Sequence, residues 1–223
     1  RSTLNAQPFF HTDASQAAGF LDLDVQKLGV DLMTLNSAKI YGPKGVACLY
    51  VRRGVRLEPV IRGGGQERGL RSGTENVAGI VGFAKALEIA EEERAKESAR
   101  LVNLRDYFVE RILKEIPGAV LNGHATARLA QNVNVSIPGI DGEAAVVYLS
   151  ERGVYASTGS ACTALSLEPS HVIAALGKSK EYTKGSLRFT LGRQTTREDI
   201  DYAVKQLKEV IRLLEPTIEV EPR

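Results

Sequence analysis

Two short polar segments near the N-terminus bring together a carboxylate, an amide and a lysine. The segment HTDASQ (11–16) contains Asp13 and Gln16, and NSAKIYGPKG (36–45) contains Lys39. Each segment lies at the end of an apolar run of strand character, and strand ends are where open α/β sheets expose their ligand sites. This combination of side chains is typical of a cofactor site.

The chemistry that these groups suit is that of pyridoxal phosphate. An enzyme that uses this cofactor needs a lysine for the Schiff base, a carboxylate that keeps the pyridine nitrogen protonated, and donors for the phosphate and the phenolic oxygen. Asp13, Gln16 and Lys39 carry the functional groups for the first of these roles. An Asp and a Lys this far apart are more often ordinary surface groups, so the residue types alone leave both interpretations open.

The two cysteines stand in contrasting surroundings. Cys162 lies in STGSACTALSLEPS (157–170), a run of small and polar residues without an apolar period, which predicts an exposed loop. The thiolate is the nucleophilic form of cysteine, and exposure lets it reach a reaction partner. Cys48 is flanked by apolar residues and is predicted to be a buried strand residue. The contrast argues against a disulfide framework and against a zinc site.

The elements that must position these residues form an N-terminal and a C-terminal group. Residues 8–53 contain the strand-like runs FFHTDAS, VDLMTLN and GVACLYVRR, with a short helix between the first two. A Gly- and Arg-rich loop (63–74) leads into long helices that extend to about Ile116 and are closed by Pro117. The rest of the chain predicts a strand at 132–139, a helix at 142–151, a strand at 186–192, and a last helix that opens with Thr195 and Glu198 at capping-box spacing and ends at Leu214.

Composition limits the class of protein. The 223 residues are 43% hydrophobic, and 29 Lys plus Arg stand against 27 Asp plus Glu without a basic tract, so neither disorder nor nucleic-acid binding is indicated. No apolar run approaches the ~20 residues of a membrane span, and no signal-peptide core is visible. We therefore expect a cytoplasmic protein without a membrane partner. The sequence begins at Arg1 and its one methionine, Met33, lies in an apolar run, which predicts a truncated or processed chain.

Five motifs spread over nearly the whole chain carry a family resemblance. They are DASQ (13–16), VDLMTLNSAKIYGPKG (30–45), GGGQERGLRSGTENVAGIVG (63–82), STGSACTALSLEPSHVIAALG (157–177) and SLRFTLGR (186–193). In content and order they resemble the cysteine desulfurases of the NifS and IscS type. The resemblance implies an α/β fold of the type I pyridoxal-phosphate-dependent transferases. It also implies that 1–95 are the remaining part of the large cofactor-binding domain, and that 96–223 form an interdomain helix and a small α+β domain with the catalytic cysteine loop.

The resemblance implies roles for the residues around the cofactor ring. Asp13 matches the partner of the pyridine nitrogen, and Gln16 matches the donor to the phenolic oxygen. Lys39 matches the Schiff-base lysine, because the family places that lysine directly before IYGPKG. Lys44 is the competing lysine, but it stands in the turn that follows the strand. A lysine suits the role because its neutral amine forms the imine and then moves the substrate proton.

The phosphate contacts depart from the family pattern at one position. The family usually has histidine directly before the cofactor lysine, and this sequence has Ala38 there. Asn36 and Ser37 remain as phosphate donors, with Asn36 at the family's usual serine position. Thr74 resembles the residue that reaches the phosphate of the partner subunit, which implies a homodimer. An N-cap for the helix that follows is the alternative role for Thr74.

The remaining roles concern the substrate. Cys162 matches the nucleophile of the SGSAC motif in the version with the longer loop. Arg188 matches the arginine that binds the substrate α-carboxylate, with Arg193 as the nearby alternative. The implied reaction converts L-cysteine to L-alanine and leaves the sulfur on Cys162 as a persulfide. A sulfur-acceptor protein, either an iron–sulfur scaffold or a tRNA-thiolation protein, then takes the sulfur, and the enzyme needs no metal.

Other hypotheses follow from what these 223 residues do not contain. An aromatic residue that stacks on the cofactor and a Gly-Thr phosphate loop precede this region in the family and have no counterpart here. A half-enzyme that needs a separate N-terminal half, inactive alone, is therefore a second hypothesis. A sulfur-relay component without a cofactor site is another, against which Lys39 and Asp13 count. A third is a selenocysteine lyase or a class V aminotransferase, and Cys162 disfavours the aminotransferase because simple transamination needs no thiol.

Overall fold

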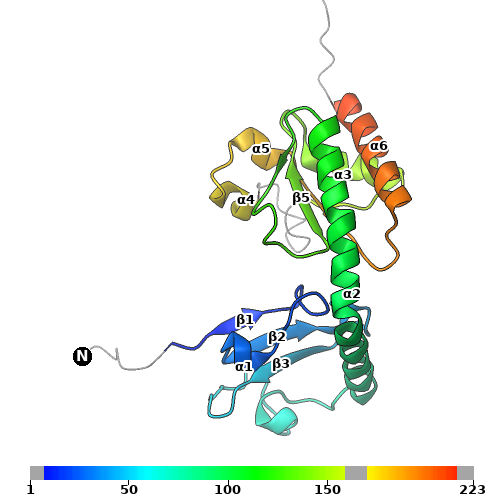
Figure 1. The fold of residues 1–223 in the computed structure, drawn as a ribbon. Helices are drawn as coiled ribbons and strands as arrows, with labels where there is room; N and C mark the ends of the chain where they lie inside the picture. The colour runs from blue at the N-terminus through cyan, green and yellow to red at the C-terminus, as the bar shows by residue number, and fades with distance from the viewer. Residues whose placement is uncertain (1–7, 159–169, 215–223) are drawn as a thin grey trace, which may run out of the picture. The chain divides into compact units, whose positions relative to one another are not determined.

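The computed structural model describes residues 8–158 and 170–214. The chain divides into two compact units, Arg1–Lys96 and Glu97–Arg223. The boundary falls inside the long helix α2, Val77–Glu115 (Figure 1). Among the described residues, no helix combines the length and the apolar character that a membrane crossing requires.

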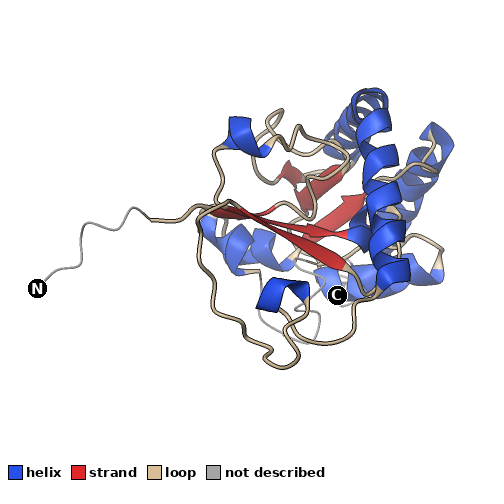
Figure 2. Cartoon of the chain, turned by 90° about the horizontal axis from the view of Figure 1, so that it is seen from below, coloured by secondary structure: helices blue, strands red, loops and turns tan. Residues whose placement is uncertain are grey.

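The first unit is built on a sheet of three strands in the order β1-β2-β3 (Figure 2, strands in red). β1 runs parallel to β2, and β2 pairs with β3 in the antiparallel direction. A four-residue helix, α1, connects β1 to β2 and begins where Asp24 accepts hydrogen bonds from the first free backbone N–H groups. The elements are β1 His11–Asp13, α1 Val25–Leu28, β2 Leu32–Asn36 and β3 Ala47–Val51.

The two faces of this sheet differ because side chains alternate along each strand. Met33 and Leu35 of β2 are buried in a core that includes Phe83 and Ala90 of α2. The neighbouring positions of the same strands, Asp13 among them, point to the opposite face. The apolar motif VDLMTLN thus forms a strand anchored under α2, and the polar residues at its end remain accessible.

α2 is one helix of 39 residues, where the sequence predicted several. Its charged middle stays helical because pairs such as Glu91 with Arg94 lie on one face, with Arg94 Nη2 at 2.9 Å from the Glu91 carboxylate. The helix is capped by Asn76, whose Oδ1 accepts a hydrogen bond from the Gly79 N–H at 3.1 Å. The N-cap alternative for Thr74 is therefore wrong.

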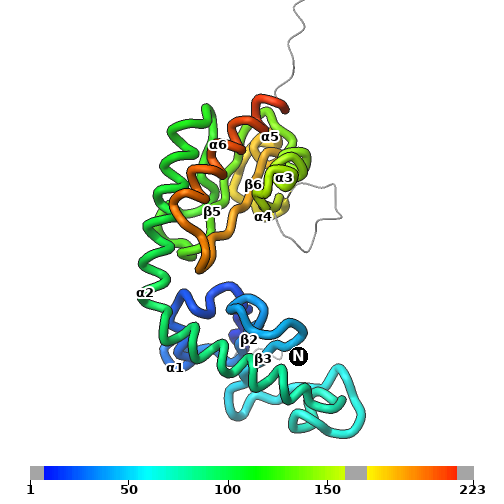
Figure 3. Tube along the Cα trace, turned by 90° about the vertical axis from the view of Figure 1, so that its right-hand side faces the viewer, coloured from blue at the N-terminus to red at the C-terminus, as the bar shows by residue number. Residues whose placement is uncertain are grey.

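The second unit contains an antiparallel sheet in the order β4-β5-β6, packed with helices. Phe108 of α2 meets Phe189 of β6 edge to face, with ring centroids 5.1 Å apart. Figure 3 shows α6 beside the C-terminal half of α2. The elements are β4 Val120–Leu121, β5 Asn132–Ser136, α3 Gly142–Glu151, α4 His171–Ala175, α5 Lys180–Lys184, β6 Ser186–Thr190 and α6 Arg197–Leu214.

The cap of α6 lies one residue later than the sequence predicted. Thr196 Oγ1 accepts from the Asp199 N–H at 3.2 Å, and Asp199 Oδ2 accepts from the Thr196 N–H at 2.9 Å. Thr195 is occupied in the preceding turn, where its Oγ1 accepts from the Gly192 N–H at 2.9 Å. The capping box therefore uses Thr196 and Asp199, because the turn after β6 withdraws Thr195.

A carboxylate between α2 and α6 gives the second unit a testable acid response. Glu115 accepts from Arg111 and from Lys208, whose Nζ lies at 2.8 Å, and these bonds lower the pKa of Glu115 from 4.5 to about 2. A depressed pKa stabilises the fold above pH 4.5, and this contribution is lost as the pH falls through 2.

We expect Glu115→Gln to lower the free energy of unfolding by about 1 kcal/mol at neutral pH, since the pair is partly exposed. Urea titrations of both proteins from pH 7 to pH 2 should converge at the acid end. Glu110→Gln, an exposed position on the same helix, is the control and should change little. A constant difference at every pH would contradict the assignment.

Candidate functional site

Lys39 lies on a short turn directly after β2. The turn, Ser37–Ile40, is a 3-10 helix. Asn36 caps it, because its Oδ1 accepts from the Ala38 N–H at 3.0 Å, and Tyr41 ends it with a left-handed φ of 63°. The Lys39 side chain is exposed. A backbone held at both ends thus presents a primary amine at the carboxyl end of a buried strand.

Asp13 closes the neighbouring strand β1 and is paired in register with Thr34 of β2. Its Oδ1 accepts from the Ser15 N–H at 2.9 Å. Hydrogen bonds from Ser15, the side-chain bond first, hold the pKa of the Asp13 carboxyl below its ordinary value, so the group is ionised at neutral pH. Because β1 and β2 are parallel, Asp13 and the turn that carries Lys39 follow the same edge of the sheet.

His11 has a definite partner in this region. Its Nε2 lies at 2.9 Å from Thr34 Oγ1, across the pair β1 and β2. His11 and Asp13 are two residues apart and therefore lie on the same face of β1, so this contact fixes the His11 imidazole next to the Asp13 carboxylate. Sequence reasoning assigned no role to Thr34. The signal that it missed is a hydroxyl in the middle of the apolar run VDLMTLN.

The candidate phosphate donors Asn36 and Ser37 differ in whether their side chains are accessible to a ligand. Asn36 uses its Oδ1 in the cap of the lysine turn, which leaves its amide hydrogens as the donors that a phosphate could use. Ser37 is fully buried, and its hydroxyl lies against Gly42, so it is not presented to a ligand. Gln16 is exposed in the turn that follows β1. The Ser37 alternative is therefore wrong, because tertiary packing covers the side chain.

Thr74 lies in the loop before α2 and is exposed. Gln66 Oε1 accepts from the Gly73 N–H at 3.2 Å, which ties the two ends of the Gly- and Arg-rich segment together. Glu67 and Arg68 adopt left-handed φ values of 48° and 59°. The loop is thus a folded structure that holds Thr74 at the surface.

Arg188 lies in the second unit, on β6. Its N–H donates to the Ser157 carbonyl at 2.7 Å, and the Ser157 N–H donates to the Arg188 carbonyl at 3.0 Å. The Arg188 Nε atom is buried, and no described residue accepts a hydrogen bond from it. A buried donor without a partner is costly, and an anionic ligand would supply one. Cys162 lies outside the described residues.

Cys48 departs from its prediction. It lies on strand β3, as the sequence indicated, but it is exposed. β3 is at the edge of the three-stranded sheet, and its outer positions are not covered within the described chain. Partial burial and the charge of Glu67 raise the pKa of the Cys48 thiol. This thiol is therefore accessible but protonated at neutral pH, which makes it a poor nucleophile.

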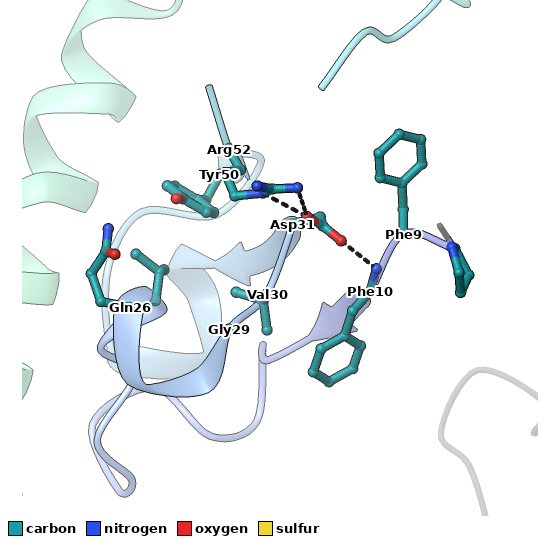
Figure 4. Close-up of a pocket in the computed structure, with 10 residues that line it drawn as sticks. Phe9, Phe10, Gln26, Gly29, Val30, Asp31, Tyr50 and Arg52 are labelled. Carbon is teal, nitrogen blue, oxygen red and sulfur yellow. Dashed lines mark hydrogen bonds and ion pairs between the residues drawn. The ribbon is translucent and has the colours of Figure 1, made fainter. Parts of the chain in front are cut away.

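A cavity of about 410 Å³ lies at the opposite ends of β1 and β2 (Figure 4). Asp31 lines this cavity. Its Oδ2 accepts a hydrogen bond from the Phe10 N–H at 2.7 Å, and its Oδ1 accepts one from Arg52 Nε at 2.6 Å. Both carboxylate oxygens therefore tie the three strands together, and the Phe10 bond is the main cause of a lowered Asp31 pKa. We assign this cavity a structural role. It is lined by Pro8, Phe9, Phe10, Val25, Gln26, Gly29, Val30, Asp31, Tyr50 and Arg52.

Comparison with known proteins identifies the family. The model of the aminotransferase class-V family matches residues 4–203, which is most of the chain. The chain belongs to the aminotransferase class-V family. Members of this family depend on pyridoxal phosphate, and the structural likeness described next confirms the α/β fold of the type I enzymes that use this cofactor.

Relatives within the class-V family bear out the resemblance to cysteine desulfurases. The chain is 50% identical to "Cysteine desulfurase IscS" of Methanosarcina thermophila over 93% of its own length and 51% of the relative's. A solved "NIFS-LIKE PROTEIN" is 37% identical with a TM-score of 0.83, covering 92% of this chain and 53% of that one. The structure "SspA in complex with cysteine" is 35% identical with a TM-score of 0.62, covering 82% and 50%. The chain spans about half the length of the curated relatives it matches.

Proposed function

We propose that this class-V chain acts in a pyridoxal-phosphate-dependent cysteine desulfurase. The observation that carries the proposal is the placement of Lys39 and Asp13, which follow two adjacent parallel strands at one edge of the sheet. Two relatives that are 50% and 48% identical to this chain are named cysteine desulfurases, which supports the same activity.

The groups at this edge fit the cofactor. Lys39 offers an exposed amine on a turn with fixed ends, and Asp13 offers an exposed carboxylate that is ionised at neutral pH. Asn36 retains amide donors of the kind that a phosphate accepts. An amine, an anion and a neutral donor on adjacent strand ends match the aldehyde, the pyridinium and the phosphate in chemical type.

The roles of the residues follow from these properties. When bound, pyridoxal phosphate supplies a ring that accepts electrons from the substrate Cα. Asp13 would keep a proton on the pyridine nitrogen, since an anionic partner favours the protonated form. Lys39 would hold the cofactor through its amine, and the same amine would accept and return the substrate's Cα proton. Gln16, exposed after β1, is the proposed donor to the phenolic oxygen.

L-Cysteine is the proposed substrate, with Arg188 as the group that binds its α-carboxylate. The unpartnered Nε of Arg188 supports this role, because a carboxylate would satisfy it and gain a charge-assisted bond. The name of the related structure, "SspA in complex with cysteine", supports the choice of substrate.

Cys162 is the proposed sulfur acceptor. Its thiolate attacks the sulfur of the substrate, the Cβ–S bond breaks, and the carbon product takes up protons to become L-alanine. One sulfur atom moves from cysteine to the Cys162 thiol, which becomes a persulfide, so the step needs no external oxidant or reductant. A sulfur-acceptor protein, an iron–sulfur scaffold or a tRNA-thiolation protein, then takes the sulfur. The cytoplasmic location expected from the composition remains a prediction.

A homodimer is proposed as the working assembly, with Thr74 reaching the cofactor phosphate of the partner subunit. Exposed apolar side chains before and after Thr74 in the sequence support an interface: Val60 is 96% exposed, Val77 65% and Val81 63%. The molar mass of the chain in solution, measured by sedimentation equilibrium, tests this assembly.

The test of the function is conversion of L-cysteine to L-alanine by the chain supplied with pyridoxal phosphate. We expect alanine and protein-bound sulfane sulfur in equal amounts on the first turnover. If cofactor attaches to Lys39 but no alanine forms, the chain alone is not the enzyme. That result would favour a half-enzyme that requires a separate N-terminal half.

Arg188→Gln should raise the KM for L-cysteine by about ten- to a hundredfold with a smaller change in kcat, because it removes a charged hydrogen bond to the substrate. Arg193→Gln is the matched control, because Arg193 lies five residues after Arg188 in the sequence, and it should leave the KM within about threefold. The opposite pattern would move the carboxylate anchor to Arg193.

A further inference from the structure

Two glycines lie where the lysine turn meets α2. Gly82 is in the interior of α2, where glycine is unfavourable in comparison with alanine. A Cβ at this position would lie 2.6 Å from Pro43 Cγ and 3.3 Å from Pro43 Cδ. A proline ring is bonded to its own backbone and cannot rotate away, so a side chain at 82 would displace the chain at 43.

Gly42 makes the second close approach. A Cβ there would lie 2.3 Å from Ser37 Oγ, 2.9 Å from the Cβ of Ala86 on α2, and 3.1 Å from the Ser37 carbonyl oxygen. The Gly42 N–H also donates to that carbonyl at 3.0 Å. Ser37 is fully buried and its hydroxyl has no partner in the described chain, so this contact rests on tight packing rather than on a side-chain hydrogen bond. We call Gly42 and Gly82 the glycine seat.

We propose that the glycine seat positions Lys39, in addition to stabilising the fold. The inference rests on the proposed role of Lys39 in holding the cofactor. The Lys39 side chain is exposed, and no contact of this side chain with another described residue fixes its direction. Its Cα–Cβ direction is therefore set by the turn Ser37–Ile40. The seat sets the distance of that turn from α2, and displacements of about 1 Å are enough to impair a reacting group.

The experiment compares Gly82→Ala with Pro43→Ala and with the double variant. Gly82→Ala introduces the clash with Pro43, and Pro43→Ala removes the atoms that cause it. Gly79→Ala is the control on the same helix, because its Cβ would meet the side chain of Asn76 and not the lysine turn. Alanine favours the helix in both glycine variants, so helix propensity cannot produce a loss.

The readout is the share of pyridoxal phosphate trapped on Lys39 relative to Lys44 after borohydride reduction, located by peptide mass spectrometry. Lys44 is exposed on the same segment and serves as the internal reference. We expect Gly82→Ala to lower the Lys39 to Lys44 ratio at least about tenfold. The ratio should return to the wild-type value in the double variant and remain there in Gly79→Ala. An unchanged ratio in Gly82→Ala would overturn the proposal, even if the variant melts at a lower temperature.

A wild-type chain that labels both lysines equally would overturn the cofactor role of Lys39 in this chain. In that case the effect of the glycine seat on the lysine turn is tested without cofactor, by measuring amide hydrogen exchange at Lys39 and Ile40. The positioning role is supported if exchange is at least about tenfold faster in Gly82→Ala and returns to the wild-type rate in the double variant. Equal exchange rates overturn it.

Discussion

Replacing Lys39 with alanine abolishes covalent attachment of pyridoxal phosphate at the edge formed by β1 and β2. The amine of Lys39 stands on a turn fixed by the Asn36 cap and by Tyr41, next to the strand that ends in Asp13. Alanine removes the nucleophilic nitrogen, so we expect the cofactor–lysine absorbance band to disappear. The specific adduct found by peptide mass spectrometry should fall at least about a hundredfold, since no other group replaces the amine.

Lys44→Ala is the matched control for this result. Lys44 is also exposed, but it follows the lysine turn and lies after Pro43. Its loss should leave the absorbance band intact. A band that survives Lys39→Ala and vanishes with Lys44→Ala would transfer the cofactor role to the second lysine. No band in any of the three proteins would mean that this chain does not form a competent site alone.

Cys162→Ser eliminates the protein-bound persulfide that forms when the chain turns over L-cysteine. A serine hydroxyl is not ionised at neutral pH and does not accept sulfane sulfur, so the loss of persulfide should be complete within detection, about a hundredfold or more. The measurement is the mass increase of one sulfur atom on the peptide that contains position 162, before and after treatment with a reductant.

Cys48→Ser is the control variant, and it tests whether an accessible thiol is enough to accept the sulfur. Cys48 is accessible, but partial burial and Glu67 raise the pKa of its thiol, so it stays protonated at neutral pH. We expect Cys48→Ser to retain the persulfide at position 162. A persulfide found on Cys48 in the wild-type chain would show that exposure outweighs thiol acidity in selecting the acceptor.

Several elements follow from local sequence alone, because their signals act over a few residues. The helix predicted at 142–151 is observed with these bounds, since Asp141 caps its first turn and accepts from the N–H groups of Glu143 and Ala144. The end of α2 before Pro117 follows in the same way. The order of motifs was enough to indicate the class-V family, and the family match over 4–203 confirmed it.

Other features depend on which elements meet in space, and no local pattern records that. Cys48 has apolar neighbours in the sequence, yet it is exposed because β3 is an edge strand of the described sheet. Ser37 is polar and next to the reactive turn, yet it is fully buried against Gly42. Thr195 has the spacing of a cap, but the turn after β6 uses its hydroxyl and leaves the cap to Thr196.

The sequence by itself determined the family and the identities of the candidate reacting groups, because these depend on residue types in a fixed order. The tertiary structure decided that Asp13 and the lysine turn share one sheet edge, since that requires β1 and β2 to pair in parallel and in register. It also decided that positions 42 and 82 must be glycine, because a Cβ at either would enter space occupied by Ser37 or Pro43. Pairing and close packing are contacts between residues distant in the chain, and burial, not local propensity, fixes them.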